Sequence, residues 1–185
     1  MPRSTARFVL SGFALLALAA CAMQPAPPPP VAAATPPVPS PTVAAHAFSD
    51  QDFVSRAVAG TALEVETSRL ARTQAASPAV RAFGRQIASE HARFHNQVLA
   101  IAQREGLVPN AAPPNPGQLA ALAGPEFDRQ YMANQVNTLQ QAITLFESEV
   151  QSGQNPSLRN LAARALPALH RELARAQAIA ARMGA

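Results

Sequence analysis

The sequence predicts an all-helical domain of four helices packed as a bundle, preceded by a segment of different character. From about residue 48 onward the chain is rich in Ala, Leu, Gln, Glu and Arg, which favour helices. Apolar residues recur there every three or four positions, as expected of amphipathic helices. The stretch that begins at Asp50 also aligns with the one that begins at Asp128, and at the same offset Pro78 aligns with Pro156. We therefore expect two copies of one helical hairpin.

Start and stop signals predict helices at about residues 50–75, 78–105, 125–151 and 156–182. Ser49 precedes the first helix and Asp52 follows three positions later, which is the spacing of a capping box. The other three helices open on a residue followed by proline, in the pairs Ser77-Pro78, Gly124-Pro125 and Asn155-Pro156. Proline is tolerated there because the N–H that it lacks has no partner in a first turn. Ser77 is expected to cap the second helix.

Each helix from the second to the fourth carries an apolar stripe that predicts its buried face. In the second helix the stripe consists of Val80, Phe83, Ile87, His91, Phe94, Val98 and Ile101. In the third it consists of Met132, Val136, Leu139, Ile143, Phe146 and Val150. In the fourth it consists of Leu158, Leu161, Ala165, Leu169, Leu173 and Ala176. These stripes are typical of a bundle core rather than of a binding motif.

The lengths of the connections predict the topology. Within each hairpin the link is only a few residues, so the helices that it joins must be antiparallel neighbours. Between the hairpins lies the proline-rich stretch 107–124, which is long enough to cross the roughly 40 Å length of a 25-residue helix. A long crossover between the second and third helices gives a ferritin-like four-helix bundle rather than a simple up-down-up-down arrangement.

Residues 1–20 have the features of a bacterial lipoprotein signal peptide. Arg3 and Arg7 precede an apolar run that ends at the small-residue sequence Leu18-Ala19-Ala20-Cys21. Cys21 is the single cysteine, and we expect it to be lipidated as the first mature residue. Ala22 follows it, which favours sorting to the inner leaflet of the outer membrane, facing the periplasm. The lipid would then be the protein's contact with the membrane.

Residues 21–47 are expected to form a Pro/Ala-rich disordered tether. Proline clusters at 27–30 and 36–37 favour extended polyproline conformations, which reach on the order of 80 Å over this length at ~3.1 Å per residue. A spacer between membrane and bundle is the favoured interpretation. A proline-rich ligand for a partner protein is the alternative.

Charge argues against nucleic acid as a partner. All 15 basic residues are arginine, and without Arg3 and Arg7 the chain has 13 arginines against 11 acidic residues. The arginines are spaced along the predicted helices beside acids, as in Arg69, Arg81 and Arg93, which is typical of solvated helix faces. The alternative is a patch for phosphate or anionic lipid.

Several short segments of the chain resemble the bacterial domain of unknown function 4142. The resemblance covers about residues 48–180 and is carried by Phe53-Val54, Glu64-Val65-Glu66, Ser89-Glu90-His91, Leu107-Val108-Pro109, Phe127-Asp128-Arg129-Gln130-Tyr131 and Leu166-Pro167-Ala168-Leu169. It implies a ferritin-like fold and an exported protein, and it supplies no activity. The family's acid–histidine pair matches Glu90-His91. Thr138 and Glu172 stand where its other histidines are common.

The residues do not predict a catalytic site. A di-iron bundle needs Glu-x-x-His in two helices, but Arg93 and Arg175 stand three residues after Glu90 and Glu172. No serine stands in a Gly-x-Ser-x-Gly turn, and no cofactor motif is present. We expect no enzymatic activity and no cofactor, a metal ion being the one alternative.

Four residues are weak candidates for a metal site, namely Glu64, Glu90, His91 and Glu172. The favoured interpretation of His91 is a buried histidine hydrogen-bonded to a carboxylate across the core. His91 and His95 have the i, i+4 spacing of a zinc pair, but no glutamate of a zinc protease lies between them. His95 and His170 are expected at solvated edges.

These observations predict an envelope lipoprotein that presents a periplasmic helical bundle with a non-catalytic binding or structural role. An unidentified envelope protein would be its partner. The alternative is a metal-binding ferritin-like protein for storage or sensing in the periplasm.

Overall fold

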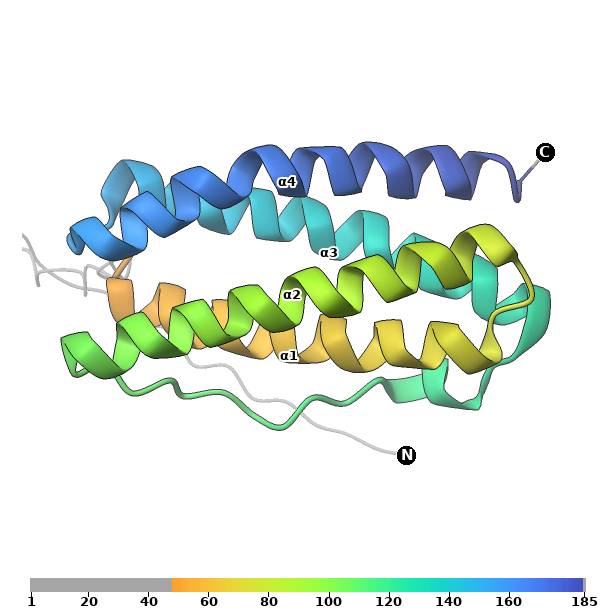
Figure 1. Ribbon diagram of the computed structural model, residues 1–185, viewed down its shortest axis with the longest axis horizontal. Helices are drawn as coiled ribbons and strands as arrows, with labels where there is room; N and C mark the ends of the chain where they lie inside the picture. The colour runs from red at the N-terminus through yellow and green to blue at the C-terminus, as the bar shows by residue number, and fades with distance from the viewer. Residues whose placement is uncertain (1–47, 185) are drawn as a thin grey trace, which may run out of the picture. The chain divides into compact units, whose positions relative to one another are not determined.

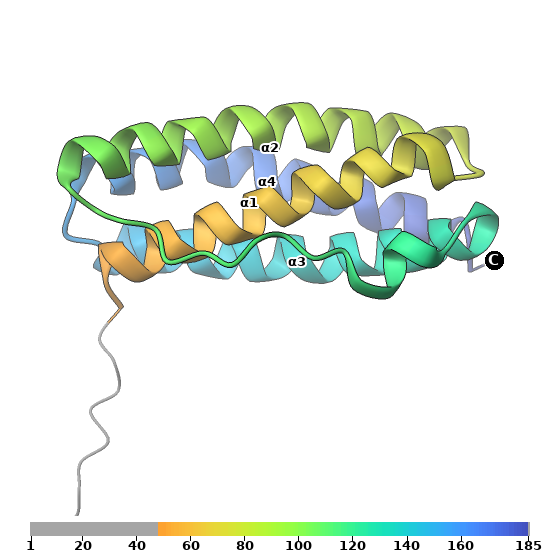
Figure 2. The same cartoon turned by 90° about the horizontal axis from the view of Figure 1, so that it is seen from below.

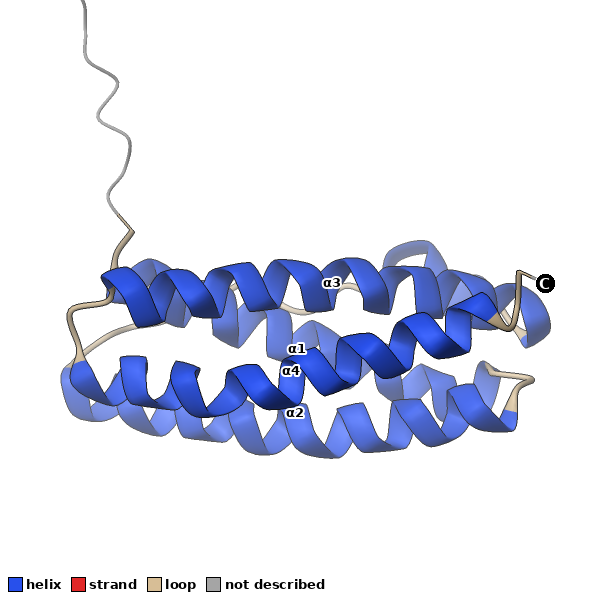
Figure 3. Cartoon of the chain, turned by 90° about the horizontal axis from the view of Figure 1, so that it is seen from above, coloured by secondary structure: helices blue, strands red, loops and turns tan. Residues whose placement is uncertain are grey.

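The computed structural model describes residues 48–184 as a bundle of four long helices (Figure 1). The helices are α1 (Asp50–Gln74), α2 (Pro78–Glu105), α3 (Gly124–Ser152) and α4 (Pro156–Ala181), with a short 3-10 helix η1 (Gly117–Ala121) before α3. No strand occurs in this part of the chain (Figure 3). The expected signal peptide, Cys21 and the proline-rich tether lie outside the described residues. No helix within residues 48–184 is both long and apolar enough to cross a bilayer.

The bundle has the predicted topology, with a long crossover between the two hairpins. α1 packs against α2 and α3 packs against α4, while α1 also lies beside α3 and α2 more loosely beside α4. The segment between α2 and α3 returns along the length of α1, so α3 starts at the end of the bundle where α1 finishes (Figure 2). The all-helical fold class, two hairpins joined by a crossover, is confirmed.

Side chains of α1 hold the crossover at both ends of the helix. Near its start, Gln51 donates to the carbonyl of Val108 at 2.6 Å, and Ser55 accepts the N–H of Asn110 at 3.1 Å. Near its end, Gln74 donates to the carbonyl of Ala120 at 2.8 Å. These bonds satisfy backbone groups that a non-helical segment leaves free.

The helix starts use the expected residues, with one exception. Ser49 accepts the N–H of Asp52 at 3.1 Å and donates to the Asp52 carboxylate at 2.8 Å, and Asn155 accepts the N–H groups of Ser157 and Leu158. The expected side-chain cap by Ser77 is wrong, because its hydroxyl makes no capping bond. A carboxylate of the other hairpin, Asp128, instead accepts the Ser77 N–H at 2.8 Å.

The internal repeat is visible in the contacts that join the hairpins. Asp128 of the second hairpin binds the backbone of the first hairpin's link, and Asp50, its counterpart in the repeat, binds the N–H of Gln154 in the second link at 2.8 Å. Each hairpin thus satisfies a backbone donor in the link of the other. A bundle of two copies therefore has matching contacts at its two ends.

Aromatic side chains fill the core. Phe53 of α1 packs edge-on against Phe146 of α3 at 5.3 Å between ring centroids, and Phe127 stacks on Tyr131 at 5.6 Å. The prediction that Val150, the last member of the α3 stripe, is buried is wrong. Val150 is 37% exposed, whereas the neighbouring Glu149 is 0% exposed. The turn of α3 at this end has rotated an acid, not a valine, into the interface with α1.

Candidate binding cavity

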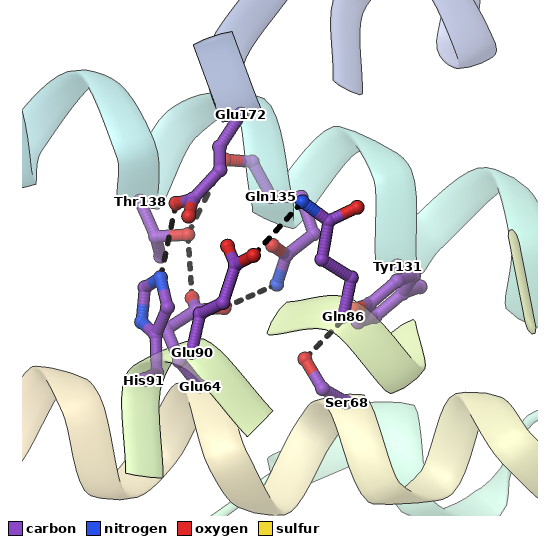
Figure 4. A network of polar contacts seen from close by, with 9 residues as sticks. All are labelled: Glu64, Ser68, Gln86, Glu90, His91, Tyr131, Gln135, Thr138 and Glu172. Carbon is purple, nitrogen blue, oxygen red and sulfur yellow. Dashed lines mark hydrogen bonds and ion pairs between the residues drawn. The ribbon is translucent and has the colours of Figure 1, made fainter. Parts of the chain in front are cut away.

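A cluster of polar side chains crosses the middle of the bundle, with contributions from all four helices (Figure 4). His91 on α2 and Glu172 on α4 are joined by a bond of 3.1 Å between Nε2 and Oε2. Both side chains are buried. The i, i+3, i+4 pattern of each helix places these two residues on its core stripe, so the pair meets where α2 and α4 pass each other.

Glu64 of α1 occupies the opposite side of the cluster. Its carboxyl accepts hydrogen bonds from two side chains of α3, the Gln135 amide and the Thr138 hydroxyl, the latter at 2.7 Å. Glu64 is buried, and Gln135 is almost fully so. These donors give the buried carboxylate the partners that it requires in a dry interior.

Glu90 neighbours His91 on α2 and completes the set of acids. Its carboxyl accepts from Gln86 at 3.1 Å. Burial raises the pKa of Glu90, and the adjacent Glu172 carboxyl raises it further. This acid therefore holds its proton more firmly than an ordinary glutamate.

His91 and Glu172 stabilise each other's charged forms. Burial lowers the pKa of His91, but the hydrogen bond to Glu172 and the surrounding carboxylates outweigh this effect, so the pKa is raised overall. Burial raises the pKa of Glu172, yet the bond from His91 and its charge outweigh that, so the pKa is lowered. The two opposite shifts favour an imidazolium–carboxylate pair in the bundle core.

The cluster forms one end of a cavity of about 580 Å³ between the helices. Carboxyl groups and His91 line this end, and the rest of the wall is mainly apolar, with Phe94, Phe146 and Leu169 among the lining residues. Two arginines, Arg56 and Arg93, also line the cavity. A volume of this size is typical of sites for small ligands, which combine apolar walls with a few polar groups.

One polar atom at this cavity lacks a partner. The Nδ1 atom of His91 is buried and makes no hydrogen bond within the described part of the chain. Buried ring nitrogens are normally paired with protein or ordered water. The hydrogen-bonding capacity of this nitrogen is therefore unused within the described residues.

The four residues proposed from the sequence, Glu64, Glu90, His91 and Glu172, all line this cavity. Within residues 48–184, however, no three His, Cys, Asp or Glu side chains are arranged to hold a metal ion. The polar groups bind one another or the amide and hydroxyl groups of α3 instead. The favoured interpretation of His91, a histidine bound to a carboxylate across the core, describes the observed contact.

The other two histidines of the bundle differ from each other. His170 is exposed, as expected. His95 is half-buried rather than at a solvated edge, because its Nδ1 lies 2.8 Å from the Thr61 hydroxyl of α1. The zinc pair that the spacing of His91 and His95 would allow is not formed, since His91 binds Glu172 while His95 lies against Thr61.

Sequence reasoning missed two polar residues of the cluster, Gln135 of α3 and Gln86 of α2, which carry no motif. Thr138 was singled out only through the family resemblance, and its bond to Glu64 was not foreseen. Sequence reasoning also missed the buried bond of 2.8 Å between the hydroxyls of Ser68 and Tyr131 (Figure 4). Burial raises the pKa of Tyr131, so its hydroxyl stays protonated.

The model of one protein family matches residues 33–179, and the family is described as a domain of unknown function, DUF4142. The chain belongs to the DUF4142 family. No curated protein matches the sequence of this DUF4142 protein.

Solved structures share the fold of this DUF4142 protein at low sequence identity. A DUF305 protein from Streptomyces coelicolor, described as secreted, is 16% identical with a TM-score of 0.64, covering 72% of this chain and 91% of its own. CopM in its Cu(II)-bound form is 16% identical with a TM-score of 0.63, covering 73% and 98%. The protein rv2844 from Mycobacterium tuberculosis is 14% identical with a TM-score of 0.59, covering 71% and 90%. At these identities the likeness establishes the four-helix bundle alone.

Proposed function

We propose that this DUF4142 protein is a non-catalytic envelope lipoprotein that binds a small ligand in the cavity of its bundle. The observation that carries the proposal is the 580 Å³ cavity with buried Glu64, His91 and Glu172 at one end and apolar walls elsewhere. A scaffold that acts only by its shape has no need for two buried acids and the half-buried Glu90 at this site, because buried charges cost stability unless they are paired.

The lining favours a ligand with a positively charged or hydrogen-bond-donating group and an apolar body. At the polar end the carboxyl groups of Glu64, Glu90 and Glu172 accept hydrogen bonds and favour a cation or a donor, while Arg56 and Arg93, which line the same cavity, offset part of the negative charge. The apolar wall, with Phe94 and Phe146, would cover the rest of the ligand. A carboxylate group would be repelled at the end lined by Glu64 and Glu172.

The test uses n-hexylamine as the probe, with 1-hexanol and hexanoate as neutral and anionic comparators. We expect saturable NMR shifts at the cavity residues with hexylamine, weaker shifts with hexanol and none with hexanoate. Ala142→Leu should fill the cavity and abolish the shifts, whereas Ala178→Leu on the exposed side of α4 should not. Equal shifts with all three probes, or none with hexylamine, would refute the proposed site.

A second candidate function is metal binding, in which a metal ion would displace the proton from the unpartnered Nδ1 of His91. In metal sites a ligating histidine commonly donates its other ring N–H to a carboxylate, as His91 can to Glu172. CopM, which shares the fold, is known in Cu(I)-, Cu(II)- and silver-bound forms. Copper titration followed by elemental analysis tests this function: His91→Ala should lose the metal, and His170→Ala should retain it. The absence of bound copper in the unaltered protein would exclude it.

We propose the outer membrane as the location, with lipid attached at Cys21. Labelling with a fatty acid followed by membrane fractionation tests this. The unaltered chain should be labelled and sediment with outer membranes, and Cys21→Ser should be unlabelled. Label retained by Cys21→Ser would refute the anchor.

A further inference from the structure

The pairing of the helices separates charge across the bundle. α2 and α4 together contain eight arginines and three glutamates, and Arg182 caps the end of α4. α1 and α3 contain four arginines and eight acidic residues. Because α2 lies beside α4 and α1 beside α3, one side of the bundle is basic and the other acidic (Figures 1 and 3).

The arginines of α4 form a straight row. Arg164, Arg171, Arg175 and Arg182 recur after two turns, one turn and two turns of the helix, which puts them on one face. All four are exposed, and the row extends about 27 Å at ~1.5 Å per residue. The row therefore presents four guanidinium groups in the same direction.

Contacts of Arg175 show which flank of α4 carries the row. Its guanidinium donates to Gln86 of α2 and lies 5.7 Å from the centre of the Phe83 ring. The row therefore runs along the flank of α4 that faces α2. On α2 itself, Arg93 and Arg104 follow Gln86 after about two and about five helical turns, so they lie on the flank that faces α4, and both are exposed.

We call these six residues the arginine seam: Arg93, Arg104, Arg164, Arg171, Arg175 and Arg182. Within residues 48–184 no carboxylate neutralises the seam by a direct ion pair, because the ion pairs there are Arg69–Glu66 on α1 and His91–Glu172 in the core. Two of the six interact with acids at longer range, Arg93 with Glu90 and Arg171 with Glu172. All six guanidinium groups are on exposed residues, so most of the positive charge of the seam faces solvent.

We propose that the arginine seam docks the bundle on a membrane surface of anionic phospholipids. One guanidinium group can donate two parallel hydrogen bonds to the oxygens of a phosphate group. Each basic residue near an anionic membrane strengthens binding to it about fivefold. The exposed large apolar residues Leu99, Val108 and Val150 lie outside the seam, so the contact is with headgroups and involves no insertion. The proposed anchor at Cys21 would keep such a surface within reach of the tether, which favours a membrane over a soluble polyanion.

The test uses the unlipidated chain carrying Cys21→Ser and vesicles of phosphatidylcholine with or without phosphatidylglycerol. Removing the lipid leaves the seam as the contact to be measured, and the result does not depend on whether the cavity binds a ligand. We expect co-sedimentation with the anionic vesicles only, weakening as salt is raised. No binding to anionic vesicles at low salt would overturn the proposal.

Two triple variants of equal charge separate the seam from net charge. The first triple variant removes three exposed members of the seam through Arg164→Gln, Arg171→Gln and Arg182→Gln. It leaves the contacts of Arg175 with α2 intact. We expect it to weaken vesicle binding about a hundredfold. The control, Arg69→Gln, Arg72→Gln and Arg129→Gln, removes exposed arginines from α1 and α3 and should weaken it far less. Circular dichroism checks that both fold. An equal loss in the two variants, or retention on heparin without vesicle binding, would refute membrane docking by the seam.

Discussion

We expect the buried carboxyl group of Glu149 to lower the stability of the bundle when it ionises near neutral pH. It is fully buried near the end of α3, and neither carboxyl oxygen has a hydrogen-bond partner among the described residues. Burial and the neighbouring Asp50 raise the pKa of Glu149 from 4.5 to about 7, while Arg159 opposes the shift. We therefore predict that Glu149→Gln stabilises the bundle at high pH.

The sign follows from proton binding. Well below pH 4.5 Glu149 is protonated in both the folded and the unfolded chain, so its titration does not change the free energy of unfolding. Between pH 4.5 and about 7 the unfolded chain releases the proton first, and the free energy of unfolding falls. Each tenfold change in an ionisation constant is worth about 1.4 kcal/mol, so the loss has an upper limit of about 3 kcal/mol. Solvent near the end of the bundle screens the charge and reduces the expected loss to about 2 kcal/mol.

Urea denaturation of both proteins at pH 4.5 and pH 8 measures this effect. The difference in unfolding free energy between Glu149→Gln and the unaltered protein should grow by about 2 kcal/mol from the lower to the higher pH. Other titrating groups cancel in that difference. Glu147→Gln, an exposed neighbour on α3, is the matched control and should show no such growth. A constant difference for Glu149→Gln would refute the reasoning.

Three further predictions concern the core. Gly84→Ala should destabilise the bundle by about 2 kcal/mol, because the new methyl group would lie 2.7 Å from the Ala71 Cβ atom. Gly60→Ala, which has open space around it, should stabilise the bundle by about 1 kcal/mol. Thermal denaturation compares the two variants, and an equal effect would contradict the close packing at Gly84. Tyr131→Phe should lower the free energy of unfolding by about 1 kcal/mol, because it leaves the Ser68 hydroxyl unpaired. Urea denaturation should show that adding Ser68→Ala recovers part of this loss. Fully additive losses from the two substitutions would contradict the bond. Glu172→Gln should lower the pKa of His91 in an NMR titration, since the bond to a carboxylate raises it, and an unchanged value would show that the pair is not formed in solution.

Much of the fold could be predicted because its signals are local or repeat along the chain. The capping residues Ser49 and Asn155 act within four residues of themselves, so they mark helix starts without knowledge of the partners. The crossover follows from chain length alone. The role of Ser77 could not be predicted in this way, because its N–H is satisfied by Asp128 of the other hairpin.

The candidate site was predictable in composition but not in geometry. The stripe of α2 indicated that His91 points inward, and the count of acids indicated possible partners. That His91 pairs with Glu172, and that Glu64 is satisfied by Gln135 and Thr138, depends on how far each helix rotates and slides against its neighbours. These rotations and shifts are determined by how the side chains of neighbouring helices fit together, so they cannot be predicted from any one helix alone.

The sequence by itself determined the helices, the repeat and the order of their connections, because propensity, capping and loop length act over short stretches of chain. Only the tertiary structure decided how the two hairpins face each other, and with that the cavity, the burial of Glu149 and the arginine seam. Over the whole chain, arginines and acids nearly cancel, although the second and fourth helices carry most of the arginines. The charges separate only when α2 is brought beside α4, because an electric field depends on distance in space and not on position in the sequence.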